Sequence, residues 1–382
     1  MNKSAKYVSG LLLCFCLMLQ YASAQKQSGL PCDKKATQET IHLYNNLKKV
    51  LSEGIMIGHQ DDLAYGVNWE YEDGRSDVKD VTGDYPAVMG FELGRLELDH
   101  AANLDGVPFD KMKGFIKDAY QHGSVITISW HLNNPLTGKT AWDPSPKETV
   151  ASILPGGSTN ALYNSWLDKV AVFLQDLKGA KGEYIPVIFR PFHELNGSWF
   201  WWGGKNCTPD EIKQLYQYTE KYLRDVKGVH HLLYAFNTDK FYTADEFLER
   251  YPGDDYADII GFDIYQRGTN AAFMKDAGNM FSMLDSIALA HNKIPALTEF
   301  GYGNLPDATW FTSTLLPVLK KHKISYALAW RNAGAKQDGS TEFYLPYKGH
   351  AAAGDFVQFC NDAQIWLQQD IAKKKLYVNN IP

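Results

Sequence analysis

The chain has 382 residues, of which 45% are hydrophobic and 21% are charged, and its formal net charge is -6. This composition is typical of a globular protein, and the negative charge gives no reason to expect a nucleic-acid partner. One large domain is the simpler expectation, because barrels of roughly 250 residues or more fold as single units. The 10 Trp and 22 Tyr residues fit either a Trp-rich core or a site for sugars, whose C–H faces stack on aromatic rings.

The N-terminus has the pattern of a secretory signal peptide over residues 1–24. A basic start precedes an apolar stretch over 8–19, which is too short to span a bilayer as a helix. Ala22-Ser23-Ala24 then supplies an Ala-x-Ala cleavage site. We therefore expect no membrane span, export to the periplasm or the medium, and a mature domain over 25–382. Cleavage leaves an odd, widely spaced set of cysteines, which predicts no disulfide framework: Cys32, Cys207 and Cys360.

Eight short apolar runs recur along the mature chain, separated by stretches in which apolar residues return every three or four positions. This alternation is typical of βαβ units. The runs are near-continuously apolar, as strands buried on both faces of a parallel sheet must be. They cover residues 54–60, 86–97, 124–131, 184–194, 232–238, 259–266, 294–301 and 326–332.

The stretches between the runs predict helices that pack on the sheet. Apolar residues fall on one stripe over 162–177 and again over 212–226. Thr208-Pro209-Asp210-Glu211 is a capping box with Pro at the first helical position, so the second of these helices has a marked start. Another helix is predicted over 41–50, before the first run.

Strands that alternate with helices can form a closed barrel or an open doubly wound sheet. The count of eight runs favours a single (β/α)8 barrel. No Gly-rich phosphate-binding fingerprint follows the first run, where Gly58-His59-Gln60-Asp61 stands. Two long connections, over 61–85 and 132–160, follow strand ends and are expected on the catalytic face, with surface elaboration as the alternative.

In a β/α barrel the active site is assembled at the C-terminal ends of the strands. No strand end here offers the Lys of a Schiff-base aldolase or the closely spaced His residues of a metal-dependent hydrolase, so we expect no metal and no cofactor. The strand-end residues are instead rich in carboxylates: His59, Glu92, Arg95, Trp130, His131, His193, Glu194, Asn237, Asp263, Tyr265, Glu299, Trp330 and Arg331.

Glu194 and Glu299 end the fourth and seventh runs, which lie opposite each other across a barrel mouth. Two carboxyls about 5 to 5.5 Å apart suit a retaining glycosidase, in which one protonates the leaving oxygen and the other attacks the anomeric carbon. The alternative is that each Glu is an ion-pair member or a surface residue. Two of them at strand ends beside aromatic residues favour catalysis.

The neighbours of the two glutamates indicate different roles. The aromatic run over 199–202 is expected to form a stacking wall that desolvates Glu194, raises the pKa of its carboxyl and keeps it protonated as an acid, with core packing as the alternative. Arg190 has the same strand parity as Glu194 and is expected to keep Glu299 ionised, although a structural ion pair would use the same geometry. Tyr265 is expected to donate a hydrogen bond to Glu299.

These residues resemble a known family. The segment FRPFHELNGSWFWWG over 189–203 closely resembles the acid/base segment of glycoside hydrolase family 26, the β-mannanase family of the large barrel clan, and TEFG over 298–301 resembles its nucleophile segment. The pieces GHQ, SWH, GFDIY and WR, starting at residues 58, 129, 261 and 330, extend the resemblance over nearly the whole mature chain.

The resemblance implies that Glu194 is the acid/base and Glu299 the nucleophile. Adjacent residues such as His193 and Glu194 alternate faces on a regular strand, so a bulge or turn is required if both reach the substrate. The implied substrate-binding residues are His131, His193, Trp199, Asp263 and Tyr265 around the reacting sugar, with Trp330 and Arg331 on its non-reducing side.

We therefore expect a monomer that hydrolyses β-1,4-mannosidic bonds in mannan, glucomannan or galactomannan with retention. One alternative keeps this mechanism but changes the substrate to a β-glucan or a xylan. A second alternative is a non-catalytic polysaccharide-binding barrel, which would need neither Glu194 nor Glu299. Endo or exo action depends on whether the loops close the cleft, and the sequence leaves that open.

Overall fold

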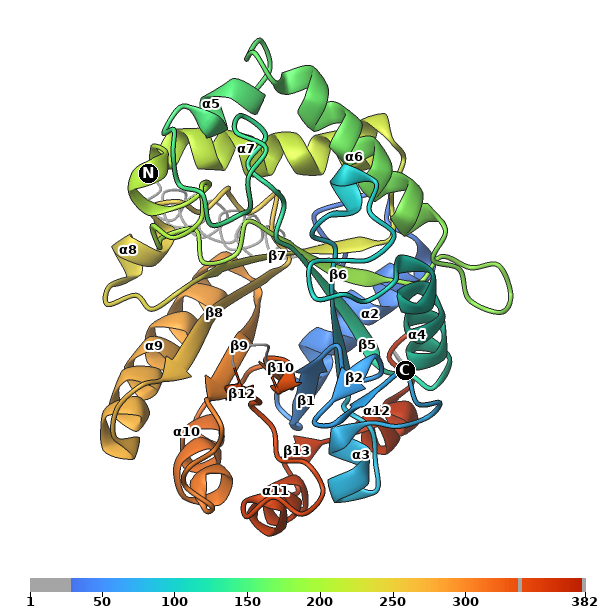
Figure 1. Cartoon of the computed structure of the whole chain (residues 1–382), viewed down its shortest axis with the longest axis vertical. Helices are drawn as coiled ribbons and strands as arrows, with labels where there is room; N and C mark the ends of the chain where they lie inside the picture. The colour runs from blue at the N-terminus through green and yellow to red at the C-terminus, as the bar shows by residue number, and fades with distance from the viewer. Residues whose placement is uncertain (1–28, 336–338, 380–382) are drawn as a thin grey trace, which may run out of the picture.

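The computed structural model describes residues 29–335 and 339–379, so the predicted leader lies outside the described residues. Eight parallel strands form a ring in which each pairs with the next along the chain and the last, β10, pairs with the first, β1 (Figure 1). The predicted (β/α)8 barrel is confirmed. Its strands are β1 (Ile55–Gln60), β4 (Val88–Glu92), β5 (Val125–Trp130), β6 (Val187–Pro191), β7 (Leu232–Thr238), β8 (Ile259–Gln266), β9 (Ile294–Tyr302) and β10 (Tyr326–Ala329).

Each of the eight predicted runs matches one barrel strand, but β4, β5, β6 and β10 end before their runs do, and the turns after β4 and β6 show why. β4 ends at Glu92, and Arg95 then adopts a left-handed conformation with φ 77° before the short 3-10 helix η1 (Leu96–Leu98). β6 ends at Pro191 and is followed by left-handed Phe192 with φ 53°. Apolar character continued past both strand ends because the turns that follow are themselves buried.

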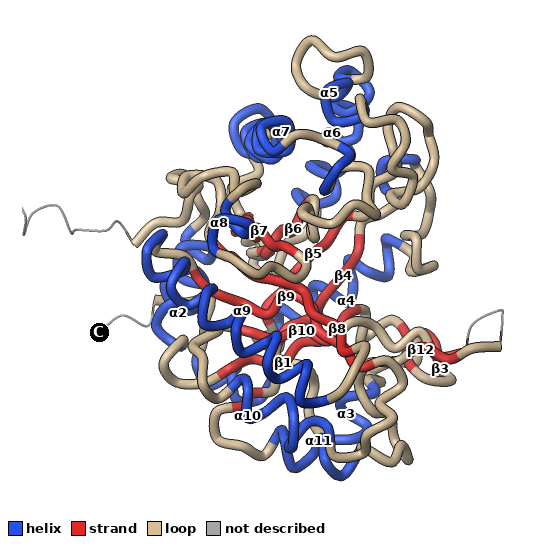
Figure 2. The backbone as a smooth tube through the Cα atoms, turned by 90° about the vertical axis from the view of Figure 1, so that its left-hand side faces the viewer, coloured by secondary structure: helices blue, strands red, loops and turns tan. Residues whose placement is uncertain are grey.

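Helices surround the ring of strands and cover its outer face (Figure 2). The predicted stripes correspond to α6 and to α7 with its π-helical extension η3 (Tyr222–Val226), and the capping box at Thr208 and Glu211 is present. The outer helices are α3 (Asp77–Thr82), α4 (Phe109–Gln121), α6 (Asn160–Gln175), α7 (Pro209–Lys221), α8 (Ala244–Leu248), α9 (Asn270–His291), α10 (Leu316–Leu319) with π-helix η4 (Phe311–Leu315), α11 (Ala353–Cys360) and α12 (Gln368–Lys374).

Two apolar cores hold the barrel. One fills its interior, where Met56 and Val88 point inward, and is closed at the N-terminal end by Leu43 and Leu47 of helix α2 (Gln38–Val50). The other lies between the strands and the outer helices. The strands are therefore buried on both faces, as their continuous apolar runs predicted.

The connections at the C-terminal ends of the strands carry small elements of their own. The 61–85 connection holds the hairpin of β2 (Tyr65–Gly66) and β3 (Trp69–Glu70), and the 132–160 connection holds α5 (Thr149–Ile153). A second hairpin, β11 (Gly334–Ala335) with β12 (Thr341–Glu342), lies beside the first, since a Cβ on Gly334 would be 3.5 Å from the carbonyl of Gly66. Short elements elsewhere are η2 (Gly204–Asn206) and β13 (Ile365–Trp366).

Two sequence expectations about the whole chain bear on the described residues. Cys32, Cys207 and Cys360 are free thiols. Among the described residues, no helix combines the length and apolar character that crossing a bilayer requires.

Candidate active site

A tight turn after β6 brings two adjacent side chains into one cavity. Phe192 and Glu194 both have left-handed backbones, with φ 53° and 52°, a conformation that is uncommon for residues other than glycine. This turn breaks the strand alternation, so His193 and Glu194 both line the cavity at the barrel mouth. The requirement stated from the sequence is met by a turn rather than by a strand bulge.

A bulge in β9 likewise brings Glu299 and the residue before it to the same side of the strand. The pairing of β8 with β9 shifts between Phe262 opposite Leu297 and Asp263 opposite Glu299, which leaves Thr298 as the extra residue. Both consecutive side chains therefore reach the barrel interior. Thr298 Oγ1 donates a 2.6 Å hydrogen bond to Asp263, and Glu299 accepts one of 2.6 Å from Tyr265 Oη.

The carboxylates of Glu194, Asp263 and Glu299 form a close cluster in which an oxygen of each lies within 4.8 Å of the other two. A metal cation could be held at such a spacing, but here the positive charge beside the carboxylates is that of an arginine side chain. The buried Arg190 guanidinium donates to Glu299 and, at 3.3 Å, to Asp263. The predicted contacts of Glu299 with Arg190 and Tyr265 are therefore confirmed.

The surroundings of Glu194 favour its protonated form. Burial raises the pKa of its carboxyl well above the ordinary range, and the negative charges of Asp263 and Glu299 raise it further. Trp199 opposes this shift, because its Nε1–H donates a 2.7 Å hydrogen bond to Glu194 Oε2. The ring of Trp199 packs so closely on Gly197 that a Cβ there would lie 2.3 Å from it.

The aromatic run after Glu194 is not the continuous stacking wall that the sequence suggested. Trp199 is 40% exposed and lines the cavity, as does the edge of Phe200. Trp201 and Trp202 are fully buried, and their indole N–H groups bond the backbone carbonyls of Leu132 and His193. Trp201 and Trp202 therefore belong to the core that packs beneath the tight turn, and Trp202 holds the backbone of this turn through its hydrogen bond to His193.

The cavity between the two glutamates has a volume of about 540 Å³, which suits a sugar-sized ligand. The ring of Trp142 stacks on that of His131 at 5.1 Å, so the long connection after β5 supplies part of the wall. Asp263, expected from the sequence to touch the reacting sugar, is fully buried and does not line the cavity; it is bonded to Thr298 and Arg190. The lining residues are His131, Trp142, His193, Glu194, Trp199, Phe200, Asp239, Lys240, Tyr265, Arg267, Glu299 and Trp330.

Arg331 lies outside this cavity, in an adjacent hollow of about 630 Å³. Its guanidinium is 3.2 Å from Asp105 and 3.6 Å from Glu342. The two small hairpins wall this hollow with Tyr65 and Trp69. Trp330 and Arg331, which follow the end of β10, therefore line different hollows: Trp330 lines the central cavity and Arg331 lines the adjacent one.

Three lining residues were missed by sequence reasoning: Asp239, Lys240 and Arg267. Each directly follows β7 or β8, so extending the strand-end rule by one or two residues would have found them. Of the strand-end residues named from the sequence, His59 faces away and bonds Asp62, and Arg95 is exposed; neither lines the cavity.

Two carboxyl groups at this spacing, beside exposed aromatic rings at the ends of the fourth and seventh strands of a (β/α)8 barrel, define a glycoside hydrolase. The chain belongs to glycosyl hydrolase family 26, whose sequence model matches residues 32–339.

The chain is similar to proteins that are named mannan endo-1,4-β-mannosidases or β-mannanases. It is 36% identical to a mannan endo-1,4-β-mannosidase of Bifidobacterium adolescentis over 353 residues, which are 86% of this chain but only 34% of that longer protein. It is 30% identical to a mannan endo-1,4-β-mannosidase of Bacillus subtilis, covering 70% of this chain and 72% of that one. A family 26 β-mannanase structure from Bacteroides ovatus matches with a TM-score of 0.87 and 43% identity, covering 91% of this chain and 99% of that one.

Proposed function

We propose that this protein hydrolyses internal β-1,4-mannosidic bonds of mannans with retention of anomeric configuration. The observation that carries the mechanism is the spacing of Glu194 and Glu299, since one carboxylate oxygen of each lies within 4.8 Å of the other. That distance suits direct attack by one carboxylate, whereas an inverting enzyme leaves about 6.5 to 9.5 Å for a water molecule.

Glu194 is the acid/base in this proposal. Its raised pKa keeps a proton available for the leaving glycosidic oxygen, and Trp199 Nε1 holds the carboxyl in place. After the leaving group departs, the deprotonated carboxylate accepts a proton from the attacking water.

Glu299 is the nucleophile. It is ion-paired with buried Arg190 and accepts a hydrogen bond from the Tyr265 hydroxyl, so both of its oxygens are oriented. A carboxylate fixed and charge-balanced in this way can attack the anomeric carbon to form a glycosyl-enzyme intermediate.

The choice of mannan rests on the relatives, which are named mannan endo-1,4-β-mannosidases or β-mannanases. The site is consistent with a sugar polymer. Trp199 and Trp330 line the central cavity, and the neighbouring hollow around Arg331 gives room for a further sugar unit.

Two variants separate the proposed roles. Glu299→Ala is expected to lose cleavage of mannan and of activated aryl β-mannosides alike, because both need the nucleophile. Glu194→Ala is expected to lose mannan cleavage but to retain glycosylation by aryl substrates with good leaving groups, which depart without a proton. Exposed Glu249→Ala is the control and keeps wild-type rates. Full mannan cleavage by Glu299→Ala would contradict the proposal.

The product profile tests the substrate and the internal cleavage. A ladder of manno-oligosaccharides released early from linear mannan is expected. Preferential cleavage of a β-glucan or a xylan, or exclusive release of disaccharide from the outset, would contradict this part of the proposal.

We also propose that the chain is exported through a cleavable leader. The support is the basic, apolar and Ala-x-Ala pattern over 1–24. N-terminal sequencing of the protein from the producing cells is expected to start at Gln25, and a retained Met1 would contradict export by cleavage.

A further inference from the structure

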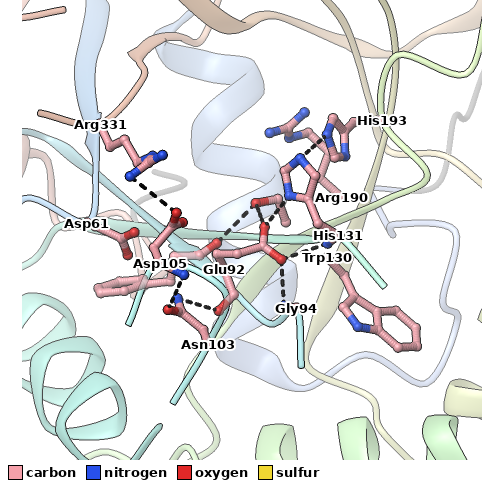
Figure 3. A network of polar contacts seen from close by, with 12 residues as sticks. Asp61, Glu92, Gly94, Asn103, Asp105, Trp130, His131, Arg190, His193 and Arg331 are labelled. Carbon is pink, nitrogen blue, oxygen red and sulfur yellow. Dashed lines mark hydrogen bonds and ion pairs between the residues drawn. The ribbon is translucent and has the colours of Figure 1, made fainter. Parts of the chain in front are cut away.

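Glu92 is a buried carboxylate close to the cavity that has no place in the mechanism above. It ends β4, has no exposed surface, and does not line the cavity. Its Oε1 accepts hydrogen bonds of 2.6 Å from the backbone N–H groups of Gly94 and His131. Its Oε2 accepts from Ser129 Oγ at 2.6 Å and lies 2.8 Å from His131 Nδ1 (Figure 3).

The other ring nitrogen of His131 contacts His193. The Nε2 atoms of the two rings are 2.9 Å apart, so one ring donates a hydrogen bond to the other (Figure 3). His193 is only 2% exposed, and its Nδ1 has no hydrogen-bond partner among the described residues. The His193 ring lines the cavity beside Glu194, so this unpartnered nitrogen, although buried, is the ring atom available to a sugar bound there.

The ionised carboxylate of Glu92 determines which ring nitrogens of His131 and His193 carry a hydrogen. An ionised carboxylate can only accept hydrogen bonds, so His131 Nδ1 must carry a hydrogen. Together with the two backbone N–H groups and Ser129 Oγ, this Nδ1–H gives Glu92 four donors, and a His131 ring that carries this one hydrogen has an acceptor at Nε2. His193 must donate its Nε2 hydrogen to it.

His193 is neutral in this arrangement. Burial lowers the pKa of its ring well below the ordinary value, and the positive charge of Arg190 lowers it further. A neutral imidazole that carries its hydrogen on Nε2 has a bare lone pair on Nδ1.

We propose that Glu92 is a positioning residue which, through His131, holds His193 in the Nε2–H tautomer and so presents Nδ1 as an acceptor for a hydroxyl of the reacting sugar. This inference rests on the proposed glycosidase function. An acceptor that takes a hydroxyl hydrogen leaves electron density on the sugar, which favours the oxocarbenium-like transition state. A donor at the same place would withdraw it.

Glu92→Gln is expected to exchange the protonated and unprotonated ring nitrogens of both histidines without changing the shape of the side chain at position 92. The two backbone N–H groups at Oε1 retain the amide oxygen, which turns the amide NH2 towards His131 Nδ1. His131 then becomes an acceptor at Nδ1 and a donor at Nε2, and His193 is left with its hydrogen on Nδ1. Replacing an orienting carboxylate by an amide is a known way to impose the wrong tautomer on a histidine.

The direct test is the ¹⁵N NMR of the histidine rings, with the His193 signals assigned by their loss in His193→Ala. In the wild-type protein we expect a protonated Nε2 and an unprotonated Nδ1 on His193, and in Glu92→Gln the reverse. A hydrogen on Nδ1 of His193 in the wild-type protein would overturn the proposal even if the variant does not fold. This measurement needs no substrate, so its outcome is separate from that of the mannan-cleavage experiments.

Kinetics supply the second test. Glu92→Gln is expected to lower kcat by about 10- to 100-fold, the usual effect of removing a partner that orients a functional histidine. In the His193→Ala background the same substitution should add nothing, because Glu92 acts through that ring. An equal loss in both backgrounds would mean that Glu92 has a merely structural role and would overturn the proposal.

A matched control exists on the same segment. Glu97 is also a buried carboxylate, 1% exposed, and it accepts from Trp130 Nε1 at 3.1 Å and from the Asn133 backbone N–H at 2.8 Å. It has no contact with either histidine. Glu97→Gln is expected to leave the His193 tautomer and the kcat of the folded enzyme unchanged.

Discussion

At the scale of single residues, the two glutamates could be found from the sequence, but their geometry could not. Position at strand ends indicated Glu194 and Glu299, and strand parity indicated the contact of Arg190 with Glu299. The left-handed turn at Phe192 could not be foreseen, since neither Phe nor Glu is a residue that signals this conformation. Such a turn persists only because buried neighbours over-determine it.

Asp239 offers a test of what raises the pKa of Glu194. Burial is the main cause, and the charge of Asp239 contributes after those of Asp263 and Glu299. The alkaline limb of kcat/KM reports loss of the acid proton. Asp239→Asn removes a negative charge, lowers the pKa of Glu194, and is expected to move this limb to lower pH.

A second variant, at Trp199, should move the alkaline limb of the kcat/KM profile to higher pH. Trp199→Phe removes the N–H that stabilises the charged form of Glu194, so its pKa rises and the proton is kept to higher pH. The measurement is kcat/KM against pH for both variants and the wild type. Alkaline limbs that shift in the same direction would contradict the assignment of Glu194 as the acid.

At the scale of elements, periodicity identified all eight barrel strands and the helices α2, α6 and α7, because long buried strands and amphipathic helices carry strong patterns. The short hairpins β2–β3 and β11–β12 were missed. Each has two residues per strand, too few to show an alternation. The bulge at Thr298 was also invisible, since it depends on the register with β8.

The capping box of α7 permits a quantitative prediction. Thr208 Oγ1 accepts the Glu211 N–H at 3.2 Å, and Glu211 Oε2 accepts the Thr208 N–H at 2.7 Å. Thr208→Ala is expected to lower the free energy of unfolding by about 1 kcal/mol, because it leaves a helix N-terminal donor without a partner. Chemical denaturation measures the change. Thr208→Ser keeps the hydroxyl and should retain most of the stability; equal losses in both variants would refute the capping role.

At the scale of the whole molecule, contacts between distant segments join the first described residues to the barrel. Asp258, the residue before β8, accepts the Cys32 N–H at 2.7 Å and the Tyr234 N–H at 3.0 Å. Asp33 is likewise 2.8 Å from His230 Nδ1. No sequence pattern indicated these contacts, since the partners Cys32 and Asp258 are 226 residues apart and each is an ordinary residue in its own segment.

Near these contacts lies an acid whose burial should affect the stability of the entire fold. Glu220 of α7 has no exposed surface, and only one of its oxygens is bonded among the described residues, to Arg224 at 2.7 Å. Burial and then the charge of Asp258 raise the pKa of Glu220 to about 8, against the partial compensation of Arg224. The folded protein therefore binds a proton at neutral pH that the unfolded chain has released.

The sign of the resulting pH dependence follows from this difference in bound protons. Between the ordinary pKa of 4.5 and the folded value of about 8, the folded state binds more protons, so Glu220 contributes a fall in stability of about 1.4 kcal/mol per pH unit as pH rises. Glu220→Gln is neutral in both states and should remove this contribution, which makes the variant more stable relative to wild type at pH 8 than at pH 5.5. Urea denaturation at both values measures the difference. Asp210→Asn, an exposed carboxyl on the same helix, should keep the wild-type slope, and a Glu220→Gln slope equal to that of the wild type would show that Glu220 is ionised in the folded protein.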